Sequence, residues 1–182
     1  MNASNKMELA LGCDHRGYTA KRKLIAFLVN MGHEVRDLGC HSVTACDYPD
    51  YAGAVARVVA SGDCDLGILL DASGIGMSVA ANKVPGIRAA LVHDQVTARL
   101  ARESNHCNVL CIGTDLVNED QLHRIVETFL TSHFMEGRHV RRVNKIKQME
   151  ADARHAEGHP CPLVGRGSKA APVVSGLVDQ TV

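Results

Sequence analysis

The chain has 182 residues, of which 46% are hydrophobic, so it is long enough to fold as one domain with a substantial core. Its 20 basic residues balance its 20 acidic residues, Trp is absent, and Phe and Tyr number three each, which disfavours a nucleic-acid partner because such a partner calls for positive charge and stacking platforms. No apolar run is long enough to span a bilayer and the N-terminus lacks a long apolar segment, so we expect a soluble, cytoplasmic protein with no membrane partner.

Short apolar runs alternate with segments of helical periodicity, which predicts five β-α units. The expected strand and helix of each unit are Glu8–Gly12 and Tyr18–Met31, Glu34–Asp37 and Tyr51–Ser61, Leu66–Leu70 and Ile75–Lys83, Arg88–Val92 and Gln95–Glu103, and Val109–Gly113 and Glu119–His133. Runs such as LGILL and NVLCIG are apolar at nearly every position, as is typical of parallel strands covered on both faces. We therefore expect an α/β fold, a Rossmann-like α/β/α sandwich with a five-stranded parallel sheet.

The C-terminal part of the chain changes in character. A sixth helix is expected from about Arg138 to about Glu157. From Gly158 onward the sequence is rich in Pro and Gly and has no helical or strand periodicity. We therefore expect one domain over residues 1–157, followed by a tail over residues 158–182 that is disordered or lies as an arm on a partner.

The seven cysteines are odd in number and form no C-x-x-C pair. Most of them lie inside or beside apolar runs, which favours reduced, buried thiols. A group of His155, His159 and Cys161 lacks a fourth ligand nearby, so we expect no metal site there.

Polar residues follow four of the five expected strands. They are Asp14 and His15 after the first strand, Asp71 and Ser73 after the third, His93 and Asp94 after the fourth, and Thr114 and Asp115 after the fifth. In open α/β sheets, ligands bind beyond the carboxyl ends of the strands. We therefore expect an active site at this edge of the sheet, which we call the rim.

The Ser73–Gly76 turn joins an apolar strand to a helix, and its glycines let backbone amides approach a ligand closely. This arrangement suits an oxyanion or a phosphate, although the spacing is neither a P-loop nor G-x-G-x-x-G. Asp71 stands at the mouth of the turn. Beside amides that stabilise an enediolate, its carboxylate is a candidate general base for aldose–ketose isomerisation. The alternative is that Asp71 only caps a tight turn in which Ser73 is the helix N-cap.

Three further clusters are candidates for ligand binding. Arg138, His139 and Arg142 form a phosphate-binding fork if the sixth helix reaches the rim, and a solvated basic face otherwise. The other two clusters are Asp47, Tyr48 and Tyr51 before the second helix, and Ser104, Asn105 and His106 before the fifth strand. The alternatives for these two are turn chemistry and a helix C-terminus.

The chain resembles the family of ribose-5-phosphate isomerase B and the galactose-6-phosphate isomerase subunits in five segments: LGCDHRGYTAK, DYPDYA, GIGMSVAANKVPGIRAAL, NVLCIG and EGRHVRRV. The resemblance covers the chain from Met7 to Glu150. It implies a Rossmann-like fold, homodimers or tetramers with sites shared between subunits, and no metal or other cofactor. It also implies interconversion of aldose and ketose phosphates through an enediolate.

The resemblance further implies roles for the residues that match the family's motifs. The matches are Asp14, His15 and Tyr48 in the substrate pocket, Ser73, Gly74 and Gly76 in the loop that holds the enediolate, Asn105 as a substrate-binding asparagine, and Arg138 and Arg142 as phosphate-binding arginines.

Three positions depart from the family's pattern. Asp71 stands where many members have the cysteine that serves as base, and the glutamate that other members use a few residues downstream is absent. Asp71 is therefore the remaining local candidate for the base. Ser104 replaces a histidine that assists ring opening, for which His106 is a candidate substitute, and Asp115 replaces an arginine near the phosphate.

Three functions are compatible with these observations. We favour an active isomerase with Asp71 as base, acting on ribose 5-phosphate, ribulose 5-phosphate or a related pentose or hexose phosphate, because one base that replaces another preserves the mechanism. The main alternative is a non-catalytic sugar-phosphate-binding protein or a silent subunit of a hetero-oligomeric isomerase. A nucleotide-binding module is disfavoured because the acidic ribose contact in a G-x-G-x-x-G context is missing.

Overall fold

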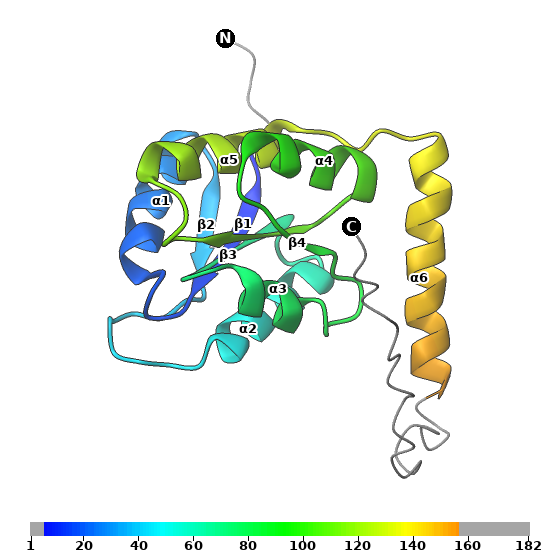
Figure 1. Ribbon diagram of the computed structural model, residues 1–182, viewed down its shortest axis with the longest axis horizontal. Helices are drawn as coiled ribbons and strands as arrows, with labels where there is room; N and C mark the ends of the chain where they lie inside the picture. Colours follow the sequence, from blue (N-terminus) through cyan, green and yellow to red (C-terminus); the bar gives the residue numbers. More distant parts are fainter. Residues whose placement is uncertain (1–5, 157–182) are drawn as a thin grey trace, which may run out of the picture.

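A five-stranded parallel sheet lies at the centre of the computed structural model, which describes residues 6–156 (Figure 1). Its strands are β1 (Glu8–Cys13), β2 (Glu34–Asp37), β3 (Leu66–Asp71), β4 (Ala89–Leu91) and β5 (Val109–Gly113). They lie in the order β2-β1-β3-β5-β4, and every neighbouring pair is parallel. The expected α/β fold with a five-stranded parallel sheet is confirmed.

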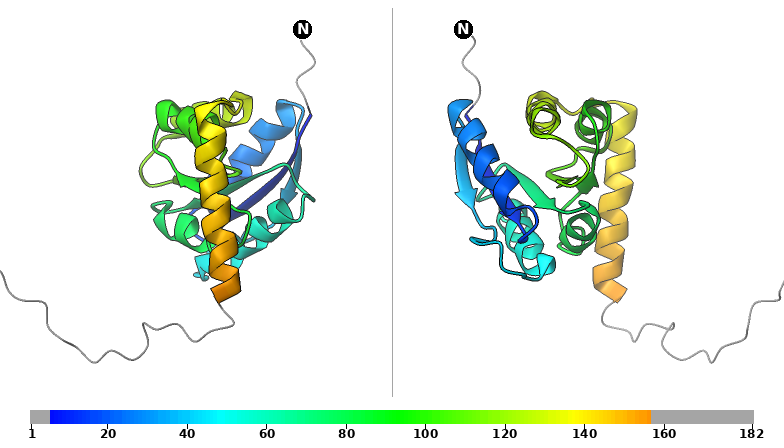
Figure 2. Two further views of the ribbon diagram at one scale, coloured as in Figure 1. Left: turned by 90° about the vertical axis from the view of Figure 1, so that its right-hand side faces the viewer. Right: turned by 60° about the vertical axis from the view of Figure 1, so that its left-hand side comes forward.

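Helices cover both faces of the sheet. One layer consists of α1 (Tyr18–Asn30), α4 (Gln95–Asn105) and α5 (Glu119–Thr131), and the other of α2 (Tyr48–Ala60) and α3 (Ile75–Ala81). The last helix, α6 (Arg138–Ala156), lies outside both layers at one side of the molecule, where it contacts α4 (Figure 2). Only a small part of α6 is therefore covered by the rest of the chain.

Alternate residues of the central strands face the two helical layers. In β3, Ile68 and Leu70 belong to the core that includes α1, α4 and α5, whereas Leu69 belongs to the core that includes α2 and α3. All three side chains are fully buried, and each contributes about 1.5–3 kcal/mol by its removal from water. The continuous apolar runs in the sequence are thus explained by burial on both faces, and the strand ends stand on a rigid base.

Two helix boundaries illustrate local control of the fold. α2 begins at Tyr48, earlier than expected, with Pro49 in its first turn. Proline is tolerated there because the N–H groups of the first turn make no hydrogen bond within the helix. The sixth helix spans Arg138–Ala156, close to its expected range. The expected tail, residues 158–182, lies outside the described residues.

The described cysteines are all free thiols, and all except Cys46 are buried. Within residues 6–156, no three His, Cys, Asp or Glu side chains are grouped so that they could hold a metal ion. His159 and Cys161 lie outside this range. None of the described helices is both long enough and apolar enough to cross a membrane.

Candidate active site

The carboxyl ends of β1 and β3 lie side by side at the rim. Cys13 pairs with Leu70, and the Asp14 amide donates a hydrogen bond to the Leu70 carbonyl at 3.2 Å. Gly17 passes so close that a Cβ atom would lie 2.5 Å from the same carbonyl oxygen. The turn that begins at Asp14 is therefore pressed against the end of β3, next to Asp71.

Asp14 and His15 are both held by backbone amides. Asp14 is 7% exposed, and its Oδ1 accepts hydrogen bonds from the amides of Arg16 (2.9 Å) and Gly17 (3.1 Å). His15 Nδ1 accepts the Cys46 amide at 3.3 Å. Because a ring nitrogen that accepts from an amide carries no proton, the neutral His15 ring holds its proton on Nε2. The partly exposed His15 side chain therefore presents a hydrogen-bond donor.

Asp71 is the last residue of β3 and is 5% exposed. Its Oδ1 accepts hydrogen bonds from the amides of Ser73 (3.0 Å) and Gly74, and its carbonyl accepts the Thr114 amide at 2.8 Å. Its second carboxylate oxygen, Oδ2, has no hydrogen-bond partner in the part of the chain that the structure describes. One oxygen thus caps the turn while the other is available to accept a proton, so the two expected roles of Asp71 are compatible.

Two glycines let the loop after β3 pass between its neighbours. Gly74 has a φ of +78°, and a Cβ atom there would lie 2.4 Å from the Leu91 side chain and 3.0 Å from the Gly113 nitrogen. A Cβ atom on Gly76 would lie 2.8 Å from the ring of Tyr48, which packs against this loop. Tyr48 therefore lies against the loop that follows Asp71.

The amides of this loop are less available to a ligand than the sequence indicates. Those of Ser73 and Gly74 donate to Asp71, and that of Ile75 donates to the Ser73 hydroxyl at 3.3 Å. The Gly76 amide has no partner within the described residues. In this conformation, the amide of the loop that is free to donate to a bound oxyanion is therefore that of Gly76.

A second group of expected site residues lies at the opposite edge of the sheet. Asn105 ends α4, whose 11 residues lead away from the rim over about 16 Å. His106 follows as a left-handed C-cap with a φ of 49°, and its ring stacks on Phe134 at a centroid distance of 4.6 Å. Burial, aided by neighbouring cationic side chains, lowers the pKa of His106, so its ring is neutral at pH 7. Within one chain, Asn105 and His106 are not brought to Asp71.

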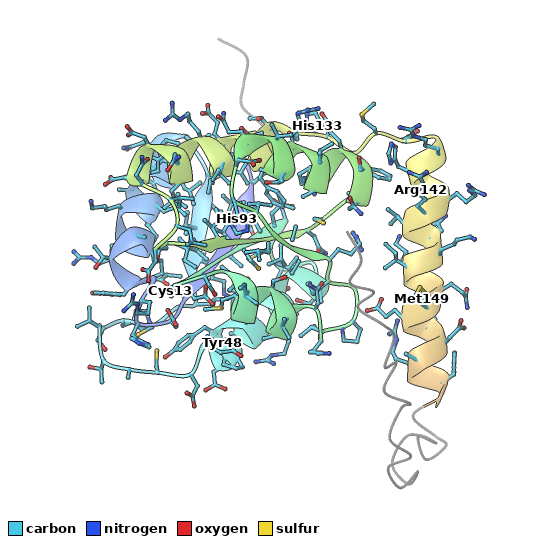
Figure 3. All side chains as sticks on the ribbon, viewed as in Figure 1. Cys13, Tyr48, His93, His133, Arg142 and Met149 are labelled. Atoms are coloured by element: carbon cyan, nitrogen blue, oxygen red, sulfur yellow. The ribbon has the colours of Figure 1, made fainter. Side chains whose placement is uncertain are left out.

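The basic residues of α6 are also distant from the rim. Figure 3 shows Arg142 on α6, well separated from Cys13 and Tyr48. Arg138 and Arg142 are exposed and have no ion-pair partner among residues 6–156. His139 is 9% exposed, and its Nδ1 has no hydrogen-bond partner there. In one chain, the proposed phosphate fork therefore does not reach the rim.

Arg16 is a rim residue that sequence reasoning missed. Its guanidinium pairs with Asp115, and both line a cavity of ≈ 320 Å³ between α1 and α5. Lys23 and Glu119 line the same cavity and form a second ion pair at 2.6 Å. The available signal was the position of Arg16 directly after Asp14 and His15. Arg16 brings a guanidinium to Asp115, the position at which the family resemblance leads one to expect an arginine.

Known proteins similar to this chain were found by sequence and by structure. The sequence profile described as Ribose/Galactose Isomerase matches residues 9–146. The chain is 42% identical over 143 residues to ribose-5-phosphate isomerase B of Escherichia coli, which covers 79% of this chain and 96% of that one. It is 40% identical over 128 residues to a galactose-6-phosphate isomerase subunit of Clostridium acetobutylicum, which covers 70% of this chain and 74% of that one.

Solved structures show the same likeness. The structure of ribose-5-phosphate isomerase B from Clostridium thermocellum aligns with a TM-score of 0.80 at 45% identity, covering 81% of this chain and 99% of that one. The enzyme of Mycoplasma genitalium, solved with bound ribulose-5-phosphate, aligns with a TM-score of 0.77 at 40% identity, covering 80% and 97%. The likeness therefore extends over the sheet and its helices.

Proposed function

The chain belongs to the ribose/galactose isomerase family, and on that premise we propose that it interconverts ribose 5-phosphate and ribulose 5-phosphate. The match to the Escherichia coli enzyme over 96% of that enzyme's length carries this proposal. As a member of the family, the chain is a sugar-phosphate isomerase, an intramolecular oxidoreductase. The similarity to a galactose-6-phosphate isomerase subunit makes a hexose phosphate the second candidate substrate.

Asp71 is the proposed general base. In the isomerisation, an open-chain aldose loses its C2 proton to a base, and the enediolate that forms regains a proton at C1. The Oδ2 atom of Asp71 suits this step because Oδ1 is held in place by two amides. The Gly76 amide and the Ser73 hydroxyl suit the enediolate oxygens, since both are donors on the same loop.

His15 is the proposed group for ring opening, a step that calls for a proton donor at the ring oxygen of the sugar. Its Nδ1 accepts the Cys46 amide, which leaves an N–H on Nε2. The matching imidazole expected from sequence, His106, lies at the other edge of the sheet in this chain. His15 therefore replaces His106 in the proposal for a site at the rim.

The phosphate end of the substrate is proposed to bind between two copies of the chain. Arg138 and Arg142 are exposed cations on a helix that lies away from the rim. Exposed apolar side chains on α3, α4 and α6 provide a surface for such a contact; they are Ile75, Val79, Val96, Leu100, Val140 and Ile146. A homodimer that covers this surface would bring α6 of one copy to the rim of the other.

Mixing two inactive variants tests the shared site. Asp71→Asn removes the base, and Arg142→Ala removes a phosphate contact, so each variant alone is expected to lose most activity. After subunit exchange, half of the dimers contain one of each chain, and one of their two sites combines an intact rim with an intact α6. The mixture is therefore expected to regain about a quarter of wild-type activity.

Native mass spectrometry of the same samples provides the control, since it reports whether mixed dimers have formed. If mixed dimers form and no activity returns, each site lies within one chain. Full activity of the wild-type protein as a monomer, measured by light scattering at the assay concentration, would also rule out a shared site.

The isomerase function is tested by proton exchange in heavy water. The full-length protein, incubated with ribose 5-phosphate in D2O, is expected to incorporate deuterium at C2 of the aldose and to form ribulose 5-phosphate. The same assay with galactose 6-phosphate tests the second candidate. If the protein binds these sugar phosphates but exchanges no carbon-bound proton with any of them, it is a silent subunit or a binding protein.

A further inference from the structure

The loop between β2 and α2 carries two thiols that the proposed reaction does not use. Cys40 is 4% exposed, and Cys46 is partly buried. Cys46 and Tyr51 pack against the core cluster that contains Cys40. The three side chains lie near enough to shift one another's pKa values. The five residues between them, His41–Ala45, are all exposed. Two neighbouring thiols at the ends of a short exposed loop can join in a disulfide if the loop adjusts to bring the sulfurs together.

The Cys40 sulfur is also a main support of this loop. The thiol donates a hydrogen bond to the Ser42 carbonyl at 2.8 Å and accepts the Ser42 amide at 3.5 Å. The Thr44 amide donates to the Ser42 hydroxyl at 3.3 Å. Among the described residues, positions 41–46 form no backbone–backbone hydrogen bond. A chemical change at the Cys40 sulfur therefore removes contacts that hold the loop.

The other end of the loop is connected to the rim. The Cys46 amide donates to His15 Nδ1 at 3.3 Å, and the Cys46 sulfur lies 3.9 Å from the same nitrogen. Two residues further on, the ring of Tyr48 packs on Gly76. A shift of Cys46 is therefore transmitted both to the imidazole and to the loop that follows β3.

We propose that Cys40 and Cys46 form a reversible disulfide that lowers the activity of the rim. The bond draws the Cys46 sulfur toward Cys40 and removes the S–H donor that holds Ser42. As the loop rearranges, the Cys46 amide no longer fixes the proton of His15 on Nε2. This inference concerns regulation of the proposed active site and rests on the role of His15 given above.

The two thiols differ in the way that such a reaction requires. Burial raises the pKa of the Cys40 thiol, but hydrogen bonds from Ser42, Cys46 and Tyr51 outweigh this effect and leave the pKa below its ordinary value. Burial and the hydrogen bond with Cys40 raise the pKa of Cys46. Cys40 is therefore the attacking thiolate, and Cys46 is the thiol that resolves the intermediate.

The oxidant that this reaction needs is a hydroperoxide. The Cys40 thiolate attacks one peroxide oxygen, the O–O bond breaks, and the products are a sulfenic acid and hydroxide, which becomes water by taking the Cys46 proton. The Cys46 thiolate then attacks the Cys40 sulfur, the S–O bond breaks and the S–S bond forms. The hydroxide that leaves becomes a second water by taking up the proton that Cys40 released to the solvent when it ionised. The two sulfurs together lose two electrons, which reduce the peroxide.

The other described cysteines do not compete with this pair. Burial raises the pKa of each of their thiols, to about 12 for Cys13 and about 11 for Cys107, and upward for Cys64 and Cys111. All four are buried. Because the thiolate is the reactive form, these cysteines stay inert while Cys40 reacts.

The test is oxidation of the full-length protein with one equivalent of hydrogen peroxide. Peptide mapping is expected to find Cys40 joined to Cys46, and isomerase activity is expected to fall by about tenfold or more, as when a positioned acid or base is lost. A dithiol reductant should restore both. Cys40→Ser should keep its activity in peroxide, and Cys46→Ser should accumulate a Cys40 sulfenic acid that a 1,3-dione reagent traps. Cys64→Ser, the matched control, should respond as the wild type does.

An activity-independent measurement separates this inference from the proposed function. The NMR signals of the His15 ring are expected to shift on oxidation and to return on reduction. A disulfide that leaves these signals unchanged, a pairing of Cys40 with Cys13 or Cys161 instead, or oxidation without any disulfide would overturn the switch. A protein that shows no isomerase activity before oxidation would refute the proposed function, while mapping and NMR still decide the switch.

Discussion

Asp37→Ala is expected to lower the free energy of unfolding by about 3–5 kcal/mol, because it leaves a buried ammonium group without its counter-ion. The side chain of Lys21 is fully buried, and its Nζ atom contacts the two carboxylate oxygens of Asp37 at 2.6 and 2.8 Å. Its remaining hydrogen-bond partner is the Cys40 carbonyl at 2.9 Å, and the Tyr18 ring lies 5.8 Å away. These neutral groups do not balance a buried positive charge, so the variant loses stability even though the carboxylate that it removes is partly exposed.

Lys21→Met serves as the control for this loss of stability. Lys21→Met removes the charge and keeps most of the volume of the side chain, and the carboxylate of Asp37, which is 31% exposed, regains water. Lys21→Met is therefore expected to cost less than Asp37→Ala, and the double variant is expected to be more stable than Asp37→Ala alone. Urea unfolding at unchanged m-value measures all three. A loss below about 1 kcal/mol for Asp37→Ala would mean that Lys21 is hydrated, as surface ion pairs are.

Lys21 also shows where sequence reasoning ends. The apolar runs of β3 and β5 identify central strands, because a strand that is buried on both faces has apolar residues at successive positions. Lys21 lies among other cations in the stretch AKRK, and nothing in that stretch distinguishes it from its solvated neighbours. Its burial depends on Asp37, a residue from the adjacent β-α unit. Such a pairing is a property of tertiary structure and has no local signature.

The position of the rim could be predicted from the topology of the sheet, whereas the arrangement of the groups at the rim could not. Strand ends of a parallel sheet meet at one edge, so Asp14 and Asp71 follow from the order of the elements. The same reasoning could have assigned His106 to the opposite edge, since the helix before it returns across the sheet. The sequence offered two directions for the Ser73 and Gly74 amides, toward a ligand or toward the Asp71 carboxylate. It could not decide between them, because peptide orientation in a short turn depends on backbone angles that residue identity does not determine.

Asp71→Asn is expected to reduce kcat by about 10²–10⁴ while stability changes little. An asparagine at this position retains an oxygen that can accept the amides of Ser73 and Gly74, as Oδ1 of Asp71 does. Its second polar atom is an NH2 group, which donates protons and cannot accept one from C2 of the sugar. The substitution therefore preserves the cap and removes the base. Deuterium incorporation at C2, measured beside the melting temperature, reports the two roles separately.

Asp94→Asn is the matched control for the loss of a negative charge from a capping position. The Oδ1 atom of Asp94 accepts the Thr97 amide at 2.7 Å at the start of α4, so its substitution is expected to lower the melting temperature slightly and to reduce the rate far less than Asp71→Asn does. Both variants thus remove one negative charge, but only Asp71→Asn removes the proposed base for the C2 proton of the sugar. If Asp71→Asn turns over substrate at the wild-type rate and melts at a lower temperature, Asp71 is only a cap. The base would then be sought at His15, whose Nδ1 atom could accept a proton only after it loses the Cys46 amide.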